Sequence, residues 1–338
     1  MHTRTIQLLM STTLAAAFGC SQTVTTQSSS GATSNRDQPE MKDSPVTPKG
    51  TIGLSVLTRT NPFFNVIADS MTEEAAKHGY EVIVTSGEFD VARQQNQVKD
   101  FIVNKCAAIV LCPCDSKSIG PAIQEATEAG IPVFTADIAC LAPGVRVVSH
   151  VATDNYGGGK EAARAMIEAL GEAGGKIVIL DFKPAESCIL RVKGFKEVIE
   201  DHNQSKAGGK ITIAAELPGD GQKDKGFKAA EDALQAHPDL AGIFAINDPS
   251  ALGARAALEK AGKANQVVLV GFDGQPEGKQ AIKEGKIYAD PVQFPERIGV
   301  ETARAIARHF AGEDVPPEIL IPTALYRKAD AVTDPTLK

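Results

Sequence analysis

Polar and aromatic side chains follow directly after several predicted strands of this chain. They are Asn61, Phe63, Phe64, Asp115, Asp137, Asn247, Asp248, Phe272 and Asp273. Planar amides and carboxylates can bind hydroxyl groups, which both donate and accept hydrogen bonds. Aromatic rings can cover apolar C–H faces with little loss of side-chain entropy. These residue types therefore favour the binding of an uncharged, polyhydroxylated ligand.

Each of these residues also has a structural interpretation. Asn61 is a favoured N-cap for a helix that begins at Pro62. Asp137 and Asp273 could likewise cap the helices that follow them. One of Phe63 and Phe64 is expected in the core, because neighbours on a helix do not share a face. The joint placement of these residues at successive strand ends, rather than any one of them, favours a binding site.

The elements that position these residues form two similar sets. Apolar runs rich in β-formers alternate with amphipathic segments, a pattern typical of parallel sheets with helices on both faces. The first set has predicted strands at 51–58, 81–85, 107–112, 132–136 and 147–151, with helices from 62, at 91–104 and at 116–129. The second has strands at 176–180, 211–216, 241–246 and 267–272, with helices at 156–170, 189–200, 224–236, 250–261 and 276–284. We predict an α/β fold of two doubly wound, Rossmann-like domains with a ligand cleft between them.

The N-terminal residues indicate export. A short apolar stretch at 8–19 follows Arg4 and precedes Cys20, as in a signal peptide that is too short to span a bilayer. Residues 17–20 are similar to the lipobox of bacterial lipoproteins, although Phe18 is bulky for its position. We expect a signal peptide at 1–19, lipid attachment at Cys20 and a polar, flexible tether at 20–48. Secretion without a lipid is the alternative.

Composition and charge restrict the function further. The chain of 338 residues is 43% hydrophobic and has a formal net charge of -7. The absence of a basic cluster in the sequence argues against nucleic acid as a partner. Five cysteines follow Cys20, and their spacing matches no metal or redox motif. We expect small buried thiols, no metal and no cofactor, with a Cys114–Cys140 disulfide left open.

The chain resembles the periplasmic ribose-binding proteins of bacterial sugar transporters over residues 49–328. The segments that carry this resemblance are 61–64 (NPFF), 148–155 (VSHVATDN), 244–248 (FAIND), 251–254 (ALGA), 270–274 (VGFDG) and 293–295 (QFP). The resemblance implies the periplasmic binding protein type 1 fold, with a three-strand hinge near 151–153, 292–294 and 321–323. It implies an N-terminal lobe of 49–151 and 293–322 and a C-terminal lobe of 152–292 and 323–338.

The resemblance also implies a function and a set of ligand contacts. The protein would deliver a monosaccharide or polyol to an ABC permease, or to a chemoreceptor, as a periplasmic monomer held to the membrane only by its lipid. The implied ligand-binding residues are Asn61, Phe63, Phe64, Cys112, Asp137, Ile138, Arg191, Asn247, Phe272, Asp273 and Gln293. Bidentate groups of this kind would fix hydroxyl stereochemistry, because an unpaired buried polar group is costly.

Three departures from the ribose-binding pattern affect the choice of ligand. Ile138 replaces an arginine, Gly221 after Asp220 replaces a second-domain aromatic residue, and Cys112 replaces an asparagine. The loss of a guanidinium fork and a ring changes both hydrogen bonding and pocket volume. These departures argue against ribose itself. A related pentose, a hexose or a sugar alcohol remains open, with Ile138 facing a deoxy position or a C–H edge.

Two other classes of protein share features with this chain. An enzyme could use Asp137 and Asp273 as an acid/base pair, but the sequence has no G-x-G-x-x-G motif after a strand and no G-x-S-x-G motif. A regulator of the lac repressor type would need an N-terminal helix-turn-helix, where this chain has an export segment. We therefore predict a binding protein and not an enzyme.

Overall fold

A computed structural model describes residues 47–205 and 208–337 of the chain. The predicted signal peptide, Cys20 and most of the predicted tether lie outside these residues. No helix in the described part of the chain is long and apolar enough to cross a membrane.

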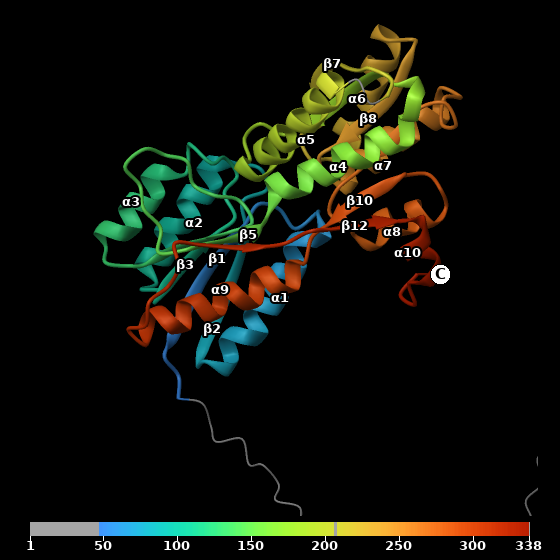
Figure 1. The fold of residues 1–338 in the computed structure, drawn as a ribbon. Coiled ribbons are helices and arrows are strands. Elements are labelled where there is room, and N and C mark those ends of the chain that lie inside the picture. The colour runs from blue at the N-terminus through green and yellow to red at the C-terminus, as the bar shows by residue number, and fades with distance from the viewer. Residues whose placement is uncertain (1–46, 206–207, 338) are drawn as a thin grey trace, which may run out of the picture. The chain divides into compact units, whose positions relative to one another are not determined.

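The first sheet, sheet A, has six parallel strands. In spatial order they are β11 (Glu318–Ile321), β5 (His150–Thr153), β4 (Val133–Ala136), β3 (Ala108–Leu111), β1 (Gly50–Val56) and β2 (Tyr80–Ser86). Its helices are α1 (Pro62–Lys77), α2 (Val91–Val103), α3 (Gly120–Glu128) and α9 (Pro295–Phe310). Helix α9 packs beside α1, although it comes more than 200 residues later in the chain (Figure 1). The central strand β3 is buried along its whole length, as expected for a parallel sheet covered on both faces.

The second sheet, sheet B, also has six strands. In spatial order they are β12 (Ala324–Arg327), β10 (Ala289–Val292), β9 (Val268–Val270), β8 (Leu240–Ala245), β6 (Gly175–Asp181) and β7 (Ile211–Pro218). Only β12 is antiparallel to its neighbour. The helices are α4 (Asn155–Leu170), α5 (Glu186–Ser205), α6 (Lys223–Ala236), α7 (Asp248–Lys260), α8 (Pro276–Lys283) and α10 (Lys328–Thr333), and a 3₁₀ turn, η1, spans Gly171–Ala173. Helices α4 and α5 pack together, as do α6 and α7 (Figure 1).

The chain passes between the two sheets three times. It leaves sheet A after β5, returns from β10 to β11, and leaves again between β11 and β12. The prediction of an α/β fold with two doubly wound parallel sheets is confirmed.

Some predicted elements have different bounds. The helix expected at 116–129 begins only at Gly120, because Oδ1 of Asp115 accepts the backbone N–H groups of Lys117 and Ser118 and holds a turn there. The strand expected at 147–151 is shifted to β5. The pattern at 189–200 indicated only the middle of α5. The returning elements β10, α9, β11, β12 and α10 were not assigned from the sequence.

The cysteines of the described residues behave as small core side chains. All five are free thiols, so the Cys114–Cys140 disulfide is not formed. Cys106, Cys112 and Cys188 are buried, and burial raises the pKa of each thiol. In the part of the chain that the structure describes, no cluster of three or more His, Cys, Asp or Glu side chains could hold a metal ion.

Candidate ligand-binding site

A pocket lies where the carboxyl ends of strands from both sheets meet. It is small: about 40 Å³ of it can hold the centre of a water-sized sphere. Its lining residues are Leu57, Thr58, Asn61, Phe63, Phe64, Phe89, Asp137, Ile138, Phe182, Ala185, Ser187, Cys188, Arg191, Gly221, Ile246, Asn247, Asp273 and Gln293. Nine of the eleven residues implied by the resemblance are in this set.

The start of α1 provides one wall of the pocket. Oδ1 of Asn61 accepts the backbone N–H of Phe63 at 3.0 Å, so Asn61 is both the N-cap and a lining residue. The rings of Phe63 and Phe64 meet edge to face, with centroids 5.3 Å apart. Both are buried in the core on the side of sheet A and both line the pocket, so a core position does not exclude a pocket contact. The first turn of a helix that begins at a cleft can present consecutive side chains to it.

Asp137 directly follows β4 and has a left-handed backbone, with φ of 63°. Its carboxyl group is buried, and Oδ1 has no hydrogen-bond partner among the described residues. Burial raises its pKa to about 7, Arg191 opposes this rise, and Asp273 and Glu186 add to it. The next residue, Ile138, also lines the pocket. Asp137 is thus a buried acceptor that a ligand hydroxyl could satisfy.

Arg191, on α5, is the buried cation of the site. Its Nε donates to Oδ1 of Asn155 at 2.8 Å, and its Nη1 donates to the carbonyl of Ile246 at 2.7 Å and to Oδ1 of Asp273 at 3.1 Å. The guanidinium also stacks over Phe272, with its carbon 3.9 Å from the ring centroid. These contacts fix the orientation of the guanidinium group, while its Nη2 makes no hydrogen bond with the described residues.

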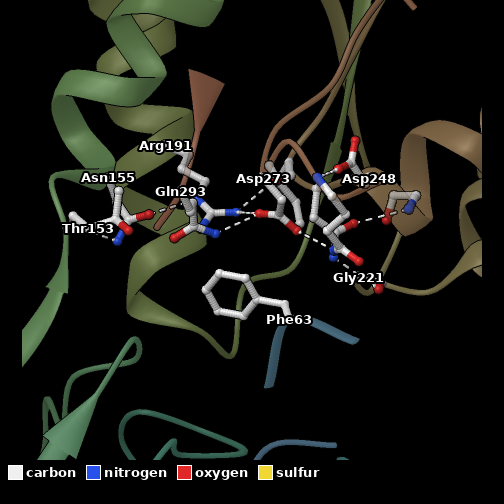
Figure 2. Close-up of polar contacts among 12 residues, drawn as sticks. Phe63, Thr153, Asn155, Arg191, Gly221, Asp248, Asp273 and Gln293 are labelled. Carbon is white, nitrogen blue, oxygen red and sulfur yellow. Dashed lines mark hydrogen bonds and ion pairs between the residues drawn. The ribbon is translucent and has the colours of Figure 1, made fainter. Parts of the chain in front are cut away.

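Asp273 joins Arg191 to two amides. Its Oδ1 accepts from Nε2 of Gln293 at 2.6 Å, and its Oδ2 accepts from Nε2 of Gln275 at 3.0 Å. Burial raises the pKa of Asp273, and Arg191 with the two amides opposes this rise. Oε1 of Gln293 is buried with no partner among the residues that the structure describes. Figure 2 shows Arg191, Asp273 and Gln293 as one network, with Phe63 nearby.

Asn247 lines the pocket but is already engaged by the protein. Its Oδ1 caps α7 by accepting the N–H of Ser250 at 3.0 Å, and its Nδ2 donates to the carbonyl of Gly221 at 3.1 Å. It therefore shapes the wall and can offer a ligand only its second N–H and the second lone pair of Oδ1.

Two implied ligand contacts do not reach the pocket. Cys112 and Phe272 are fully buried and are not among its lining residues. Cys112 packs in the core of sheet A, and its carbonyl accepts from Nε2 of Gln94. The ring of Phe272 packs against the guanidinium of Arg191. Asp115 does not line the pocket either, because it caps its own turn.

The structure adds residues that sequence reasoning missed. The largest are Phe89 and Phe182, with Leu57, Thr58, Ala185, Ser187, Cys188 and Ile246 beside them. Phe182 directly follows β6, and Phe89 lies three residues after β2. Phe182 could have been found from the sequence, because it directly follows a strand, whereas Phe89 lies farther from its strand end.

Two doubly wound sheets with a polar and aromatic pocket between their strand ends define a two-lobed ligand-binding protein. The chain belongs to the periplasmic binding protein family, whose periplasmic binding protein domain matches residues 52–314.

Several relatives are transporter components. A ribose import binding protein of Salmonella typhimurium is 36% identical over 79% of this chain and 87% of its own length. A D-apiose import binding protein of Paraburkholderia graminis is 31% identical over 83% of this chain and 88% of its own length. An ABC transporter solute binding protein from Agrobacterium vitis, solved with α-D-tagatopyranose, has a TM-score of 0.78 at 27% identity and covers 86% of this chain and 98% of its own.

Proposed function

We propose that this protein is the substrate-binding component of a bacterial ABC sugar importer, which binds a monosaccharide or a sugar alcohol between its lobes. The relatives bind different sugars by name, which supports the class of ligand and not a particular member. The predicted tether and the pocket together suit one task, the capture of a small solute outside the cytoplasm.

One observation carries this proposal. Oδ1 of Asp137 and Oε1 of Gln293 are buried acceptors in or beside the pocket with no partner in the described part of the chain. Buried acceptors are costly unless they receive a hydrogen bond. Ligand hydroxyls are donors of the right kind, and a hydroxyl can also accept from Nη2 of Arg191. The rings of Phe63 and Phe64 would cover the C–H faces of a sugar.

Binding would be coupled to closure because the ligand groups come from both sheets. Asp137 and Phe63 belong to the side of sheet A, and Arg191 and Asp273 to the side of sheet B. A ligand that contacts both sets stabilises only the closed arrangement. We assign residues 49–151 and 293–322 to an N-terminal lobe, and 152–292 and 323–338 to a C-terminal lobe. The membership of the strands in the two sheets supports this division.

We further propose that the closed protein is a monomer that contacts an ABC permease through the rims of its cleft. A role with a chemoreceptor would use the same closed state. We propose lipid attachment at Cys20 in the periplasm, which metabolic labelling with palmitate in cells would test. Replacement by Cys20→Ala is expected to abolish the label and to release the protein from the membrane fraction.

We also propose that the site binds without catalysis. Asp273 is held by Arg191, Gln275 and Gln293, so its carboxylate is occupied by structural partners. This arrangement suits recognition better than proton transfer. Incubation with a bound sugar should return the sugar unchanged.

A thermal-shift screen of pentoses, hexoses and alditols tests the proposal. A ligand that binds only the folded state raises the melting temperature. At least one monosaccharide or alditol is expected to do so by several degrees, whereas amino acids and phosphorylated sugars are not. A panel in which no carbohydrate raises the melting temperature would remove the basis of the proposal. The departures at Ile138 and Gly221 lead us to expect a ligand other than ribose.

A further inference from the structure

The pocket is polar at one end and aromatic at the other. In sheet B, Gln293, Asp273 and Asn247 follow β10, β9 and β8 in that spatial order, and Phe182 follows β6 beyond them. In sheet A, Asp137 follows β4, while Phe89 follows the edge strand β2. Polar groups thus lie towards the strands where the chain crosses between sheets, and the two rings lie towards the opposite edges.

The free hydrogen-bonding atoms follow the same division. The unpartnered acceptors of the lining, on Asp137 and Gln293, are both on the polar side. On the aromatic side, Thr58 donates to Oε2 of Glu88 at 2.9 Å, and Oδ1 of Asn61 caps α1. The Thr58 hydroxyl and Oδ1 of Asn61 therefore have protein partners already, whereas Nδ2 of Asn61 makes no hydrogen bond with the described residues. A ligand hydroxyl placed there would meet mostly apolar surface.

The two rings meet across the cleft. Phe89 and Phe182 pack edge to face, with centroids 5.9 Å apart. Gly221 lies beside this pair of rings: a Cβ at 221 would lie 4.0 Å from Cδ1 of Phe182, an ordinary contact, and 3.2 Å from Nδ2 of Asn247. An aromatic side chain at 221 would extend into the space beside that ring. The ring that resemblance places after Asp220 is thus supplied here from a different strand.

The backbone at Phe89 is held in an uncommon conformation to present its ring. Phe89 has φ of 61° and Glu88 has φ of 51°, in the left-handed region that bulky residues rarely adopt. The Glu88 carboxylate accepts from Thr58, from Ser86 and from the backbone of Arg59. The N–H of Phe89 donates to the carbonyl of Leu57 at 3.2 Å. Strained backbone of this kind persists where surroundings fix it, often at ligand sites.

We infer that the ligand is a monosaccharide with an apolar exocyclic end, a methyl group in place of a hydroxymethyl group, which packs against Phe89 and Phe182. This inference rests on the proposed sugar-binding function. The ring hydroxyls of such a 6-deoxy sugar face Asp137, Arg191 and Gln293, and its methyl group faces the aromatic pair. A hydroxymethyl group in that position would lose its hydrogen bond to water without gaining one from the protein.

Matched sugar pairs test this inference by calorimetric titration of the full-length protein. The pairs differ only at carbon 6: D-galactose and D-fucose, D-glucose and 6-deoxy-D-glucose, L-galactose and L-fucose, and L-mannose and L-rhamnose. In the pair whose ring stereochemistry fits, the 6-deoxy member is expected to bind about 10-fold tighter. The inference is overturned if sugars bind but the hydroxymethyl member of each binding pair binds as tightly.

A variant of Phe89 separates this role from simple closure of the cleft. Asn tolerates the left-handed region, so Phe89→Asn removes the ring and leaves the backbone in place. It is expected to reduce the preference within the pair to less than about twofold. Lys105→Asn is the matched control, because Lys105 also has a positive φ, of 52°, and does not line the pocket. If Phe89→Asn weakens both members of the pair equally, the rings serve closure alone and the inference fails.

The two proposals fail in different ways. If no carbohydrate in the matched pairs or in the wider screen binds, the sugar-binding function fails and the inference fails with it. If pentoses or alditols bind but no 6-deoxy sugar does, the function stands and only the inference is overturned.

Discussion

Ser116 donates its backbone N–H to the carbonyl of Pro184 at 2.9 Å, and so joins the loop after β3 in sheet A to the loop after β6 in sheet B. The Oγ of the same serine accepts the N–H of Glu186 at 3.0 Å. Ser116 is buried at this contact. These two hydrogen bonds connect loops of the two sheets away from the three chain crossings, so we expect them to form only when the cleft is closed.

Ser116→Ala is expected to weaken ligand binding without affecting the fold of either lobe. It removes the acceptor for Glu186, and the net contribution of one hydrogen bond is about 1 kcal/mol. The dissociation constant for the bound sugar should therefore rise about fivefold, as measured by calorimetric titration. Thr127→Ala is the control, because Thr127 bonds only within its own helix. An unchanged affinity in Ser116→Ala would mean that this contact does not stabilise the closed state.

Arg191→Lys is expected to destabilise the protein although the charge is kept. An ammonium group cannot keep three directed hydrogen bonds to Asn155, Ile246 and Asp273 together with stacking on Phe272. The free energy of unfolding should fall by about 2–4 kcal/mol, because a buried ion pair is left poorly compensated. Urea denaturation measures this change. Lys193→Arg, at an exposed site on the same helix, should change it by less than about 0.5 kcal/mol. Equal effects of the two substitutions would contradict this account of the network.

A buried pair of carboxyl groups predicts a stability that depends on pH. Asp248, at the start of α7, and Asp290, in β10 of sheet B, are buried next to each other, and burial raises the pKa of both, that of Asp290 to about 7. Repulsion from Asp273 raises both pKa values further. A backbone N–H lowers each in turn: that of Gln275 lowers the pKa of Asp248, and that of Gly271 lowers the pKa of Asp290. Because the folded pKa exceeds the unfolded value, the folded state binds the proton more tightly. The stabilisation is complete below about pH 4 and is lost as pH rises through 7.

Asp290→Asn removes one of these titrating groups. The variant should lose less stability than the wild type between pH 5 and pH 8, by at least about 1 kcal/mol. Urea denaturation at the two pH values measures the difference. Asp239→Asn is the control, because Asp239 is exposed. Parallel stability curves for wild type and Asp290→Asn would mean that the pair does not titrate in this range.

Sequence reasoning succeeded where a residue follows the end of a regular strand. The positions of Asn61, Asp137 and Asp273 at one pocket depend on strand ends that apolar β-rich runs and flanking turns reveal; Gln293 was found only through the resemblance. Sequence reasoning wrongly placed Phe272 in the pocket. A residue at a strand end can also point away from the cleft, and Phe272 packs under the guanidinium of Arg191.

The remaining features depend on tertiary contacts. Strands β11 and β12 are short and half exposed, so their patterns do not distinguish them from loops. Nothing local indicates that β11 pairs with β5, more than 160 residues earlier. Phe89 was missed because its ring reaches the pocket only through two consecutive residues of positive φ, a conformation that side-chain periodicity does not report. Pairing over long distances and special backbone geometry lie outside what propensity describes.

Asp137→Asn is expected to raise stability and lower affinity at the same time. Burial raises the pKa of Asp137 from 3.8 to about 7, so stability is lost as pH rises through 7 and the ionised form is costly at pH 8. Asn accepts the left-handed backbone and cannot ionise, so the free energy of unfolding at pH 8 should rise by about 1 kcal/mol or more.

The affinity of the same variant should fall because a hydroxyl bonds more strongly to a carboxylate than to an amide oxygen. The dissociation constant at pH 8 should rise about 5- to 10-fold, and this factor should shrink towards pH 5, where the wild-type carboxyl group is itself protonated. Titrations at both pH values measure it. Asp115→Asn is the matched control, because Asp115 follows a strand of the same sheet but caps a turn outside the pocket. A residue with only a structural role would move stability alone, so opposite changes in stability and affinity identify Asp137 as a ligand contact.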